Sequence, residues 1–390
     1  MLKVLIFRPD NIGDVVLFSG ALKHIRRLYP AATITLAVQS HTVELMAFCP
    51  YVDACISIDR ISWWDRIWYG RGKGLKAGEG LVRGLNSLWN RLPCFTNVLL
   101  YPVKSPQLEH LKIISGLNHD LNFSRIIGIT GCMVNSPPEG YPTGMEPEHL
   151  FTEFLDVSGE DPWRHELLTT LDFLRFLGCP VSGVEEILPQ LWLAEPDRNL
   201  VAGKDRKGSR IIGLFPGAAF EGRCWATKNY GRLAQLLGSE YTYAIFGNDA
   251  DKGLAQHVAS AIKEACVGAD IINLAGKTTL RELAKTIAAC DLLVSTETSG
   301  LHIAIAAGVL SLGIMGGGHY GRFAPWGDPE KGLFLTKKMK CFHCNWECPA
   351  GDFGCIQGVS PEDVAVAAKR LLAGDVPATS IPEGQRVDEY

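Results

Sequence analysis

The sequence predicts an α/β chain with two doubly wound parallel sheets, one in each half. Strand-like hydrophobic runs alternate with helix-like amphipathic runs in both halves, which is the order of parallel sheets with right-handed crossovers. The chain has 390 residues, more than one ordinary core needs. Two polar turns, at residues 8–14 and 295–300, each follow a strand and precede a helix of small apolar residues. Such turns lie at the carboxyl ends of parallel strands, so we expect two sheets that face a central cleft.

The first predicted domain covers residues 1–185. Short runs rich in Val, Ile and Leu predict its strands, and apolar residues at helical spacing predict its helices. We expect a Pro- and Gly-rich loop at 135–148. The predicted strands are 3–7, 32–38, 54–59, 96–101 and 125–130, and the predicted helices are 15–28, 41–48 and 165–177.

The second predicted domain covers residues 209–372, after a linker at 186–208 and before a polar tail at 373–390. Its alternation of strands and helices is more regular than that of the first. Thr279 and Glu282 have the spacing of a capping box. The predicted strands are 210–217, 241–247, 270–274, 291–295 and 309–318, and the predicted helices are 230–237, 250–264, 279–289, 301–307 and 361–372.

Composition excludes several classes of protein. The net charge of −4 gives no basic field for nucleic acid. No apolar run reaches the roughly 18 residues of a membrane-spanning helix, and the first residues do not resemble a signal peptide. Most of the twelve cysteines are scattered, which is typical of reduced thiols. We therefore expect a cytoplasmic protein that does not bind nucleic acid.

Two turns of the second half favour binding of an anion. The turn at 215–219 has small residues that permit close approach, and residues 298–300 precede a helix whose dipole and free amides favour phosphate. Arg223 and Lys228 add positive charge nearby. Together these features describe a site for a nucleotide diphosphate. The alternative is that each turn is only a structural loop.

Asp14 follows the first predicted strand, where its carboxylate has two interpretations. It could cap the next helix by accepting backbone N–H groups. It could instead face the cleft and take a proton from an attacking hydroxyl group.

Several motifs together resemble glycosyltransferase family 9, the family of the ADP-heptose:lipopolysaccharide heptosyltransferases. The first is R-P-D-N-I-G-D-V-V-L at 8–17. The others are a Pro-Gly turn followed by a basic residue and Trp within 215–225, a strand-Gly-acid element at 246–251, and E-T-S-G-L-H-I-A-I-A at 297–306. The resemblance covers residues 1–59 and 95–372. It implies the GT-B fold, with two Rossmann-like domains that bind acceptor and donor respectively.

The resemblance also implies roles for individual residues. Asp14 would be the general base, Arg223 would hold the diphosphate and assist its departure, and Asp251 would reach the ribose. The reaction would invert the anomeric carbon and need no catalytic metal. It would move a heptose or similar sugar from an ADP-sugar to a lipid-linked saccharide such as lipopolysaccharide core. The other donor-binding residues would be Gly217, Ala218, Lys228, Glu297, Thr298, Ser299, Gly300, Leu301 and His302, and the acceptor-binding residues would be Arg8, Asp10 and Gly13.

Three departures from the family pattern keep alternatives open. Arg223 replaces the usual Lys, Glu297 the usual Asp, and Thr298-Ser299 the usual Thr-Gly. The last two lie in the donor sugar pocket, so another nucleotide sugar or another acceptor is an alternative. A non-catalytic nucleotide-sugar-binding protein is a second. An NAD-dependent enzyme is disfavoured, because the first turn lacks G-x-G-x-x-G.

Four cysteines form a cluster with the spacing C-x2-C-x3-C-x6-C, at Cys341, Cys344, Cys348 and Cys355. Thiolates at this density could hold a structural zinc or iron ion. The alternative is a tight loop of reduced or locally paired thiols.

Residues 60–91 form a basic, aromatic insertion. Seven Lys and Arg residues outnumber one Asp and one Glu there, beside four Trp residues and one Tyr. This composition suits peripheral contact with lipid headgroups at the cytoplasmic face of the inner membrane. The alternative is a loop that packs its Trp side chains into the first domain.

Overall fold

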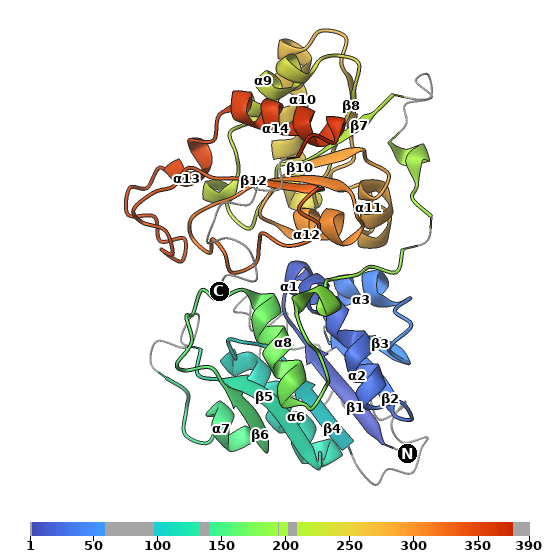
Figure 1. The fold of residues 1–390 in the computed structure, drawn as a ribbon, viewed down its shortest axis with the longest axis vertical. Coiled ribbons are helices and arrows are strands. Elements are labelled where there is room, and N and C mark those ends of the chain that lie inside the picture. The colour runs from blue at the N-terminus through green and yellow to red at the C-terminus, as the bar shows by residue number, and fades with distance from the viewer. Residues whose placement is uncertain (1, 59–96, 133–139, 194, 202–208, 377–390) are drawn as a thin grey trace, which may run out of the picture. The chain divides into compact units, whose positions relative to one another are not determined.

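The computed structural model describes residues 2–58, 97–132, 140–193, 195–201 and 209–376. The chain divides into two compact units, Met1–Ile187 (unit 1) and Leu188–Tyr390 (unit 2). Each unit is a parallel sheet with helices packed on it (Figure 1), so the predicted α/β class with two doubly wound sheets is confirmed. The predicted insertion at 60–91 lies outside the described residues.

Unit 1 contains a six-stranded parallel sheet in the order β3-β2-β1-β4-β5-β6. This is the strand order of the dinucleotide-binding fold, whose two halves diverge between β1 and β4. Strands β1 and β4 are fully buried, which explains their unbroken hydrophobic runs. The strands are β1 (Lys3–Arg8), β2 (Thr33–Val38), β3 (Ala54–Ser57), β4 (Asn97–Tyr101), β5 (Arg125–Thr130) and β6 (Glu153–Asp156).

The helices of unit 1 connect these parallel strands. Three of them, α1, α2 and α3, belong to the first half of the sheet, and α6, α7 and α8 follow strands of the second half. The bounds are α1 (Ile12–Phe18), α2 (Leu22–Leu28), α3 (Ser40–Met46), α6 (Leu108–Leu121), α7 (Pro147–Leu150) and α8 (Glu166–Phe176).

Unit 2 has the same strand order, read as β9-β8-β7-β10-β11-β12. Its strands are β7 (Ile211–Phe215), β8 (Thr242–Ile245), β9 (Asp270–Asn273), β10 (Leu292–Thr296), β11 (Leu310–Ile314) and β12 (Gly332–Leu335). Helix α9 packs against α10 and α14, and α12 packs against α11. The helices are α9 (Thr227–Leu237), α10 (Lys252–Ala265), α11 (Leu280–Ile287), α12 (Ser299–Ala306), α13 (Gly354–Gln357) and α14 (Pro361–Ala373).

Several predicted elements need correction. The helix expected at 15–28 starts at Ile12 and is interrupted by a 3₁₀ turn at Ser19–Ala21, so it forms two helices. Strands β6 and β12 and helix α6 were not predicted. Strand β6 has two polar residues among its four, E-F-L-D, and β12 follows the turn-like segment G-D-P-E-K, so neither carries a clear strand signal. The capping box of Thr279 and Glu282 is confirmed by hydrogen bonds in both directions.

The strand order also corrects the pairing of the two polar turns. In unit 1 the turn at 8–14 follows β1, which comes first in the sequence and lies in the middle of its sheet. In unit 2 the turn at 295–300 follows β10, whose equivalent in unit 1 is β4. The two turns therefore follow strands that are not equivalent. The turn of unit 1 follows the strand before the divergence point of its sheet, and the turn of unit 2 follows the strand after it.

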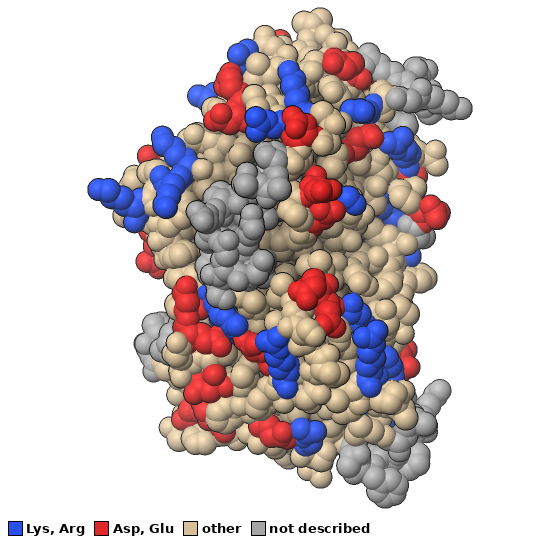
Figure 2. Space-filling model, in the orientation of Figure 1, with Lys and Arg blue, Asp and Glu red and all other residues tan. Residues whose placement is uncertain are grey.

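Surface charge is mixed in the part of the chain that is described. Figure 2 shows Lys and Arg side chains interspersed with Asp and Glu on the face drawn. Among the described residues, no helix combines the length and the apolar character needed to cross a bilayer.

Candidate active site

Two turns of unit 2 lie side by side at the carboxyl edge of its sheet. Strands β7 and β10 are parallel neighbours, with Ser295 in register with Phe215. The Thr296 hydroxyl group donates to the Gly217 carbonyl oxygen at 3.3 Å. The Pro-Gly turn and the segment before α12 are thus held together at the point where this fold binds ligands.

Helix α12 begins very close to the end of β7. A Cβ atom at Gly300 would lie 2.4 Å from the Phe215 ring, so only glycine allows this approach. Thr298 stands at the N-cap position with extended backbone, and its side chain does not cap the helix. The first amides of α12 therefore point out of the helix beside the Pro-Gly turn, as in anion sites at helix N-termini.

Arg223 is fixed to the same segment. It ends a short 3₁₀ turn, Glu221–Arg223, and its Nη2 donates to the Glu297 carbonyl oxygen at 2.7 Å. Two positions later, Trp225 is 1% exposed and its indole N–H donates to the Val359 carbonyl oxygen at 3.0 Å. The buried indole anchors the turn, which leaves the Arg223 guanidinium held beside the start of α12.

Glu297 is an unusual buried carboxyl group. Its side chain is 4% exposed, and neither carboxylate oxygen has a hydrogen-bond partner. Burial raises the pKa of Glu297 to about 7, although the positive charge of Arg223 acts in the opposite direction. A buried polar group without partners is costly, so its retention here points to a ligand that would satisfy it.

His302 has a defined tautomer. The Trp326 indole N–H donates to His302 Nδ1 at 3.0 Å, with the two rings nearly parallel at 7° and their centroids 6.0 Å apart. Because Nδ1 accepts, the imidazole proton resides on Nε2. His302, the fourth residue of the short helix α12, is thereby a hydrogen-bond donor through Nε2.

The other predicted donor residues differ in what they can contact. Asp251 packs directly on Gly217, where a Cβ atom would meet its carboxylate at 2.5 Å, and it also accepts from the Asn248 amide at 2.9 Å. Lys228 is exposed in the first turn of α9, and Ala218 and Ser299 are partly exposed. Leu301 is fully buried, so only its backbone can face a ligand.

In unit 1, Arg8 organises the turn after β1. Its Nη2 forms an ion pair with Asp10 at 2.7 Å and donates to the Asp14 carbonyl oxygen at 3.1 Å. It also donates to the Pro102 carbonyl oxygen after β4, and its guanidinium lies 4.8 Å from the Phe18 ring centroid. Arg8 is 6% exposed, so the structure gives it a role in holding the turn.

Asp14 is not the N-cap residue of its helix. Helix α1 begins at Ile12 with Asn11 at the N-cap, which places Asp14 in the first turn. There its carboxylate is stabilised by the helix dipole and remains partly exposed, as does the neighbouring Gly13. This position is compatible with the interpretation in which Asp14 faces a substrate, which stays a prediction.

Sequence reasoning missed three aromatic positions. Tyr101 at the end of β4 hydrogen-bonds to His110 at 2.8 Å, beside Arg8. Burial lowers the pKa of His110 to about 3, and the Arg8 charge adds to the effect. Trp326 and Trp346 contact predicted site residues from 24 and 123 positions away, respectively. No local sequence motif predicts these contacts, because the residues are distant in the sequence and come together only in the fold.

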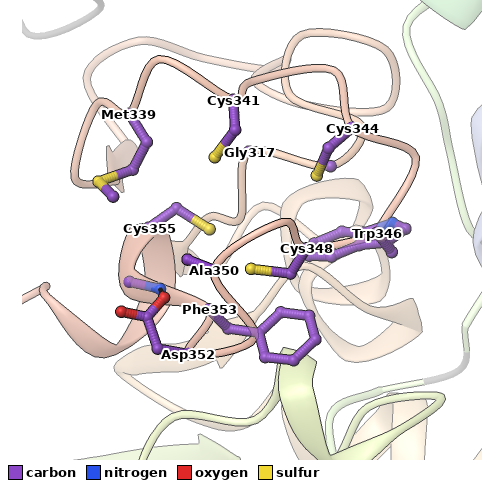
Figure 3. A pocket seen from close by; sticks show the side chains of 12 residues that line it. Gly317, Met339, Cys341, Cys344, Trp346, Cys348, Ala350, Asp352, Phe353 and Cys355 are labelled. Atoms are coloured by element: carbon purple, nitrogen blue, oxygen red, sulfur yellow. Dashed lines mark hydrogen bonds between the residues drawn. The ribbon is translucent and has the colours of Figure 1, made fainter.

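The four clustered cysteines line one pocket in unit 2, with their sulfur atoms directed inward (Figure 3). All four are free thiols. Among the described residues, no group of three or more His, Cys, Asp or Glu side chains is already placed to hold a metal ion.

Comparison with known sequences identifies the family. A family model described as glycosyltransferase family 9 (heptosyltransferase) matches residues 162–349. Lipooligosaccharide heptosyltransferase 2 of Haemophilus ducreyi is 33% identical over 309 residues, which are 78% of this chain and 80% of that protein. Lipopolysaccharide heptosyltransferase 2 of Escherichia coli K12 is 30% identical over 315 residues, with the same coverage. The match to lipooligosaccharide heptosyltransferase 2 of Campylobacter jejuni is shorter and spans about half of that protein, 52% of its length.

Solved structures agree with the fold. A glycosyltransferase family 9 protein from Veillonella parvula superimposes with a TM-score of 0.71 at 18% identity, over 95% of this chain and 97% of the other. ADP-heptose lps heptosyltransferase II of Escherichia coli gives a TM-score of 0.65, also at 18% identity, over 95% and 98%. With relatives at 30% identity or more over most of its length, the chain belongs to glycosyltransferase family 9, the heptosyltransferase family.

Proposed function

We propose that this protein is an inverting glycosyltransferase that moves a heptose from an ADP-sugar to a lipid-linked saccharide such as lipopolysaccharide core. The proposal rests on the arrangement of three side chains in unit 2. Arg223 is bound to the segment before α12, Glu297 has a buried carboxyl group, and His302 has an imidazole that donates a hydrogen bond. All three residues lie within the segment that matches the family model. The names of the relatives supply the donor and acceptor classes.

The donor binds to unit 2 in this proposal. Its diphosphate accepts hydrogen bonds from the first amides of α12 and from Arg223, and Lys228 adds positive charge. The small residues Gly217 and Ala218 leave room for the nucleotide, whose ribose hydroxyl groups bind Asp251. The sugar hydroxyl groups bind Glu297 and His302, which satisfies the carboxyl oxygens that lack partners in the protein.

The acceptor binds to unit 1 in this proposal. Asp14 takes the proton of an acceptor hydroxyl group while its oxygen forms a bond to the anomeric carbon of the donor. The bond from that carbon to the β-phosphate oxygen breaks, its electron pair leaves with ADP, and the configuration at carbon inverts. Arg223 and the α12 dipole stabilise the developing negative charge, so we propose that this step needs no metal ion.

Two further parts of the proposal concern location. A lipid-linked acceptor would place the enzyme at the cytoplasmic face of the inner membrane, in peripheral contact. The insertion at 60–91 has the composition for that contact. Vesicle sedimentation tests it: Lys73, Lys76 and Arg83 changed together to Ala should weaken binding to anionic vesicles, and unchanged sedimentation would refute the role.

The identity of the donor sugar is the least constrained part. Glu297 is one methylene longer than the Asp of the family pattern, so a donor other than ADP-heptose is the second candidate. A panel of ADP-heptose, other ADP-sugars and UDP-sugars, each with and without core-truncated lipopolysaccharide, measures acceptor-dependent nucleotide release. We expect release with ADP-heptose only when acceptor is present. Tight binding of every donor without any release would show that the protein is a binder and not an enzyme.

A further inference from the structure

The four clustered cysteines occupy a pocket that the proposed reaction does not use. Their sulfur atoms point toward a common space lined otherwise by apolar groups such as Met339 and Phe353 (Figure 3). His343 and Asp352, two nearby residues that could bind a cation, have other hydrogen-bond partners. His343 Nε2 lies 3.0 Å from the Tyr320 carbonyl oxygen, and Asp352 accepts from the Gly354 amide at 3.0 Å. The pocket therefore offers four sulfur ligands.

The loop that carries the cysteines has a strained backbone. Five non-glycine residues among those described have positive φ, and four of them lie in this loop: His343, Asn345, Trp346 and Phe353, with φ between 48° and 66°. A side chain makes this left-handed conformation unfavourable, so it persists where the surroundings enforce it. Amides of His343 and Asn345 donate to Gly317 and Gly318 at 2.7 and 3.2 Å, which ties the first half of the loop to the end of β11.

The same loop reaches the candidate active site through Trp346. The Arg223 guanidinium lies over the Trp346 ring, 4.4 Å from its centroid. The indole packs so tightly on Gly318 that a Cβ atom there would lie 2.4 Å from the ring. Phe220, three residues before Arg223, meets the indole edge-on at 6.1 Å. The position of Arg223 thus depends on where this loop holds its Trp.

We propose that Cys341, Cys344, Cys348 and Cys355 bind one soft divalent metal ion, zinc or ferrous iron, and that this ion holds Trp346 over Arg223. Four thiolates around an apolar space suit the tetrahedral coordination of these ions, with metal–sulfur bonds of about 2.3 Å. No three of the side chains are already at ligand spacing, so binding draws the sulfur atoms inward and releases their protons. The ion is structural, because it takes no part in sugar transfer.

Metal content tests the proposal without any measurement of activity. The full chain is purified under reducing conditions without chelators, and its metals are quantified by mass spectrometry. We expect about one zinc or iron ion per chain, lost in Cys344→Ser and Cys348→Ser. Cys55→Ser, a partly buried thiol of β3 in unit 1, is the matched control and keeps the ion. Which of the two metals is found identifies the ion.

Because the serine variants could fail to fold, thiol protection in the unaltered protein provides a second measurement. Four thiols should lose their reactivity toward a thiol reagent when one equivalent of Zn²⁺ or Fe²⁺ is added to chelator-treated protein. Less than about 0.2 ion per chain, together with no protection by either ion, would overturn the metal site.

The link to Arg223, which depends on the proposed function, is tested by calorimetry with ADP. Removal of the ion should weaken ADP binding several-fold in the unaltered protein and have no further effect in Trp346→Ala. Equal weakening in both proteins would refute the coupling. A protein with full metal content but no acceptor-dependent nucleotide release would instead contradict the proposed function, so the two failures are distinguishable.

Discussion

In unit 1 the turn after β1 carries a closed ion pair between Arg8 and Asp10, whereas in unit 2 the turn after β10 carries a buried carboxyl group, Glu297, with neither oxygen hydrogen-bonded. Both turns flank the point where the same strand order diverges. The Arg8 guanidinium of unit 1 pairs with the side-chain carboxylate of Asp10. The Arg223 guanidinium of unit 2 donates to the backbone carbonyl oxygen of Glu297.

The difference shows how one fold prepares two kinds of site. In unit 1 the ion pair of Arg8 and Asp10 fixes the loop, although Arg8 Nε and Asp10 Oδ1 lack hydrogen-bond partners, and Asp14 is partly exposed in the first turn of α1. In unit 2 both carboxyl oxygens of Glu297 lack a hydrogen-bond partner in the protein, which suits a ligand that brings its own hydroxyl groups. In the proposed reaction, unit 1 would supply the reactive group Asp14 and unit 2 would supply the donor-binding surface.

The largest expected effect is on turnover after substitution of Asp14. Asp14→Asn should lower kcat by about 10²–10⁴-fold, because the variant cannot take the acceptor proton. Its affinity for ADP, measured by calorimetry, should stay within about twofold, because one factor of two is only about 0.4 kcal/mol. Asp53→Asn, an exposed partner of Arg26 in the same unit, is the control for general damage. If Asp14→Asn kept full turnover, Asp14 would not be the general base.

The fold was predictable to the extent that hydrophobic periodicity reports it. Buried strands such as β1 and β10 are unbroken apolar runs, and the Thr279 capping box marks the start of α11. Strand β12, G-L-F-L, was hidden because it directly follows the turn-like segment G-D-P-E-K. The break between α1 and α2 was also hidden, because the helical pattern continues through Ser19–Ala21.

The site was predictable as a set of residue types, but its pairings were not. The sequence indicated that Arg223, Glu297 and His302 belong together. It did not indicate that Glu297 is buried without partners, that Trp326 fixes the His302 tautomer, or that Trp346 lies on Arg223. These facts depend on contacts between distant segments, which a local pattern does not encode.

The second prediction concerns the buried carboxyl group of unit 2. The pKa of Glu297 is about 7 in the folded chain against an ordinary value of 4.5, so the folded state holds this proton more tightly than the unfolded state. Its contribution to stability is complete below pH 4.5 and is lost as the pH rises through about 7. The difference corresponds to about 3 kcal/mol, at about 1.4 kcal/mol per pH unit.

Denaturant unfolding of unliganded protein at pH 5 and pH 8 tests this expectation. The free energy of unfolding should fall between these values in the unaltered protein and fall less in Glu297→Gln, whose amide cannot ionise. Glu264→Gln, at an exposed position of α10, is the matched control. If the free energy of unfolding of Glu297→Gln keeps the full pH dependence of the unaltered protein, Glu297 does not cause it. The carboxyl group of unit 2 would then not differ from the paired carboxylate of unit 1.

The third prediction concerns the guanidinium of unit 2. Arg223→Ala should weaken ADP binding by about 10–100-fold, since charge-assisted hydrogen bonds contribute about 1.5–3 kcal/mol. Arg223→Lys should recover part of the loss, because it keeps the charge but not the planar stack on Trp346. Arg232→Ala, which breaks an exposed ion pair with Glu362 in the same unit, should leave ADP affinity unchanged. If the unaltered protein and all three variants bound ADP with equal affinity, the diphosphate would not bind at Arg223.

The smallest expected effect tests whether Trp326 positions His302. Trp326→Phe keeps the stacked ring and removes the N–H donor, so His302 Nδ1 is no longer held as an acceptor. Because His302 donates to the sugar in the proposed site, the variant should lose a few-fold in affinity for ADP-heptose and keep its affinity for ADP, both measured by calorimetry at one pH. Trp225→Phe loses an indole hydrogen bond of the same 3.0 Å length to Val359, and should change both affinities by the same factor. An unchanged ratio of the two affinities in Trp326→Phe as well would mean that the indole only fills space, and that the tautomer of His302 is set by another contact.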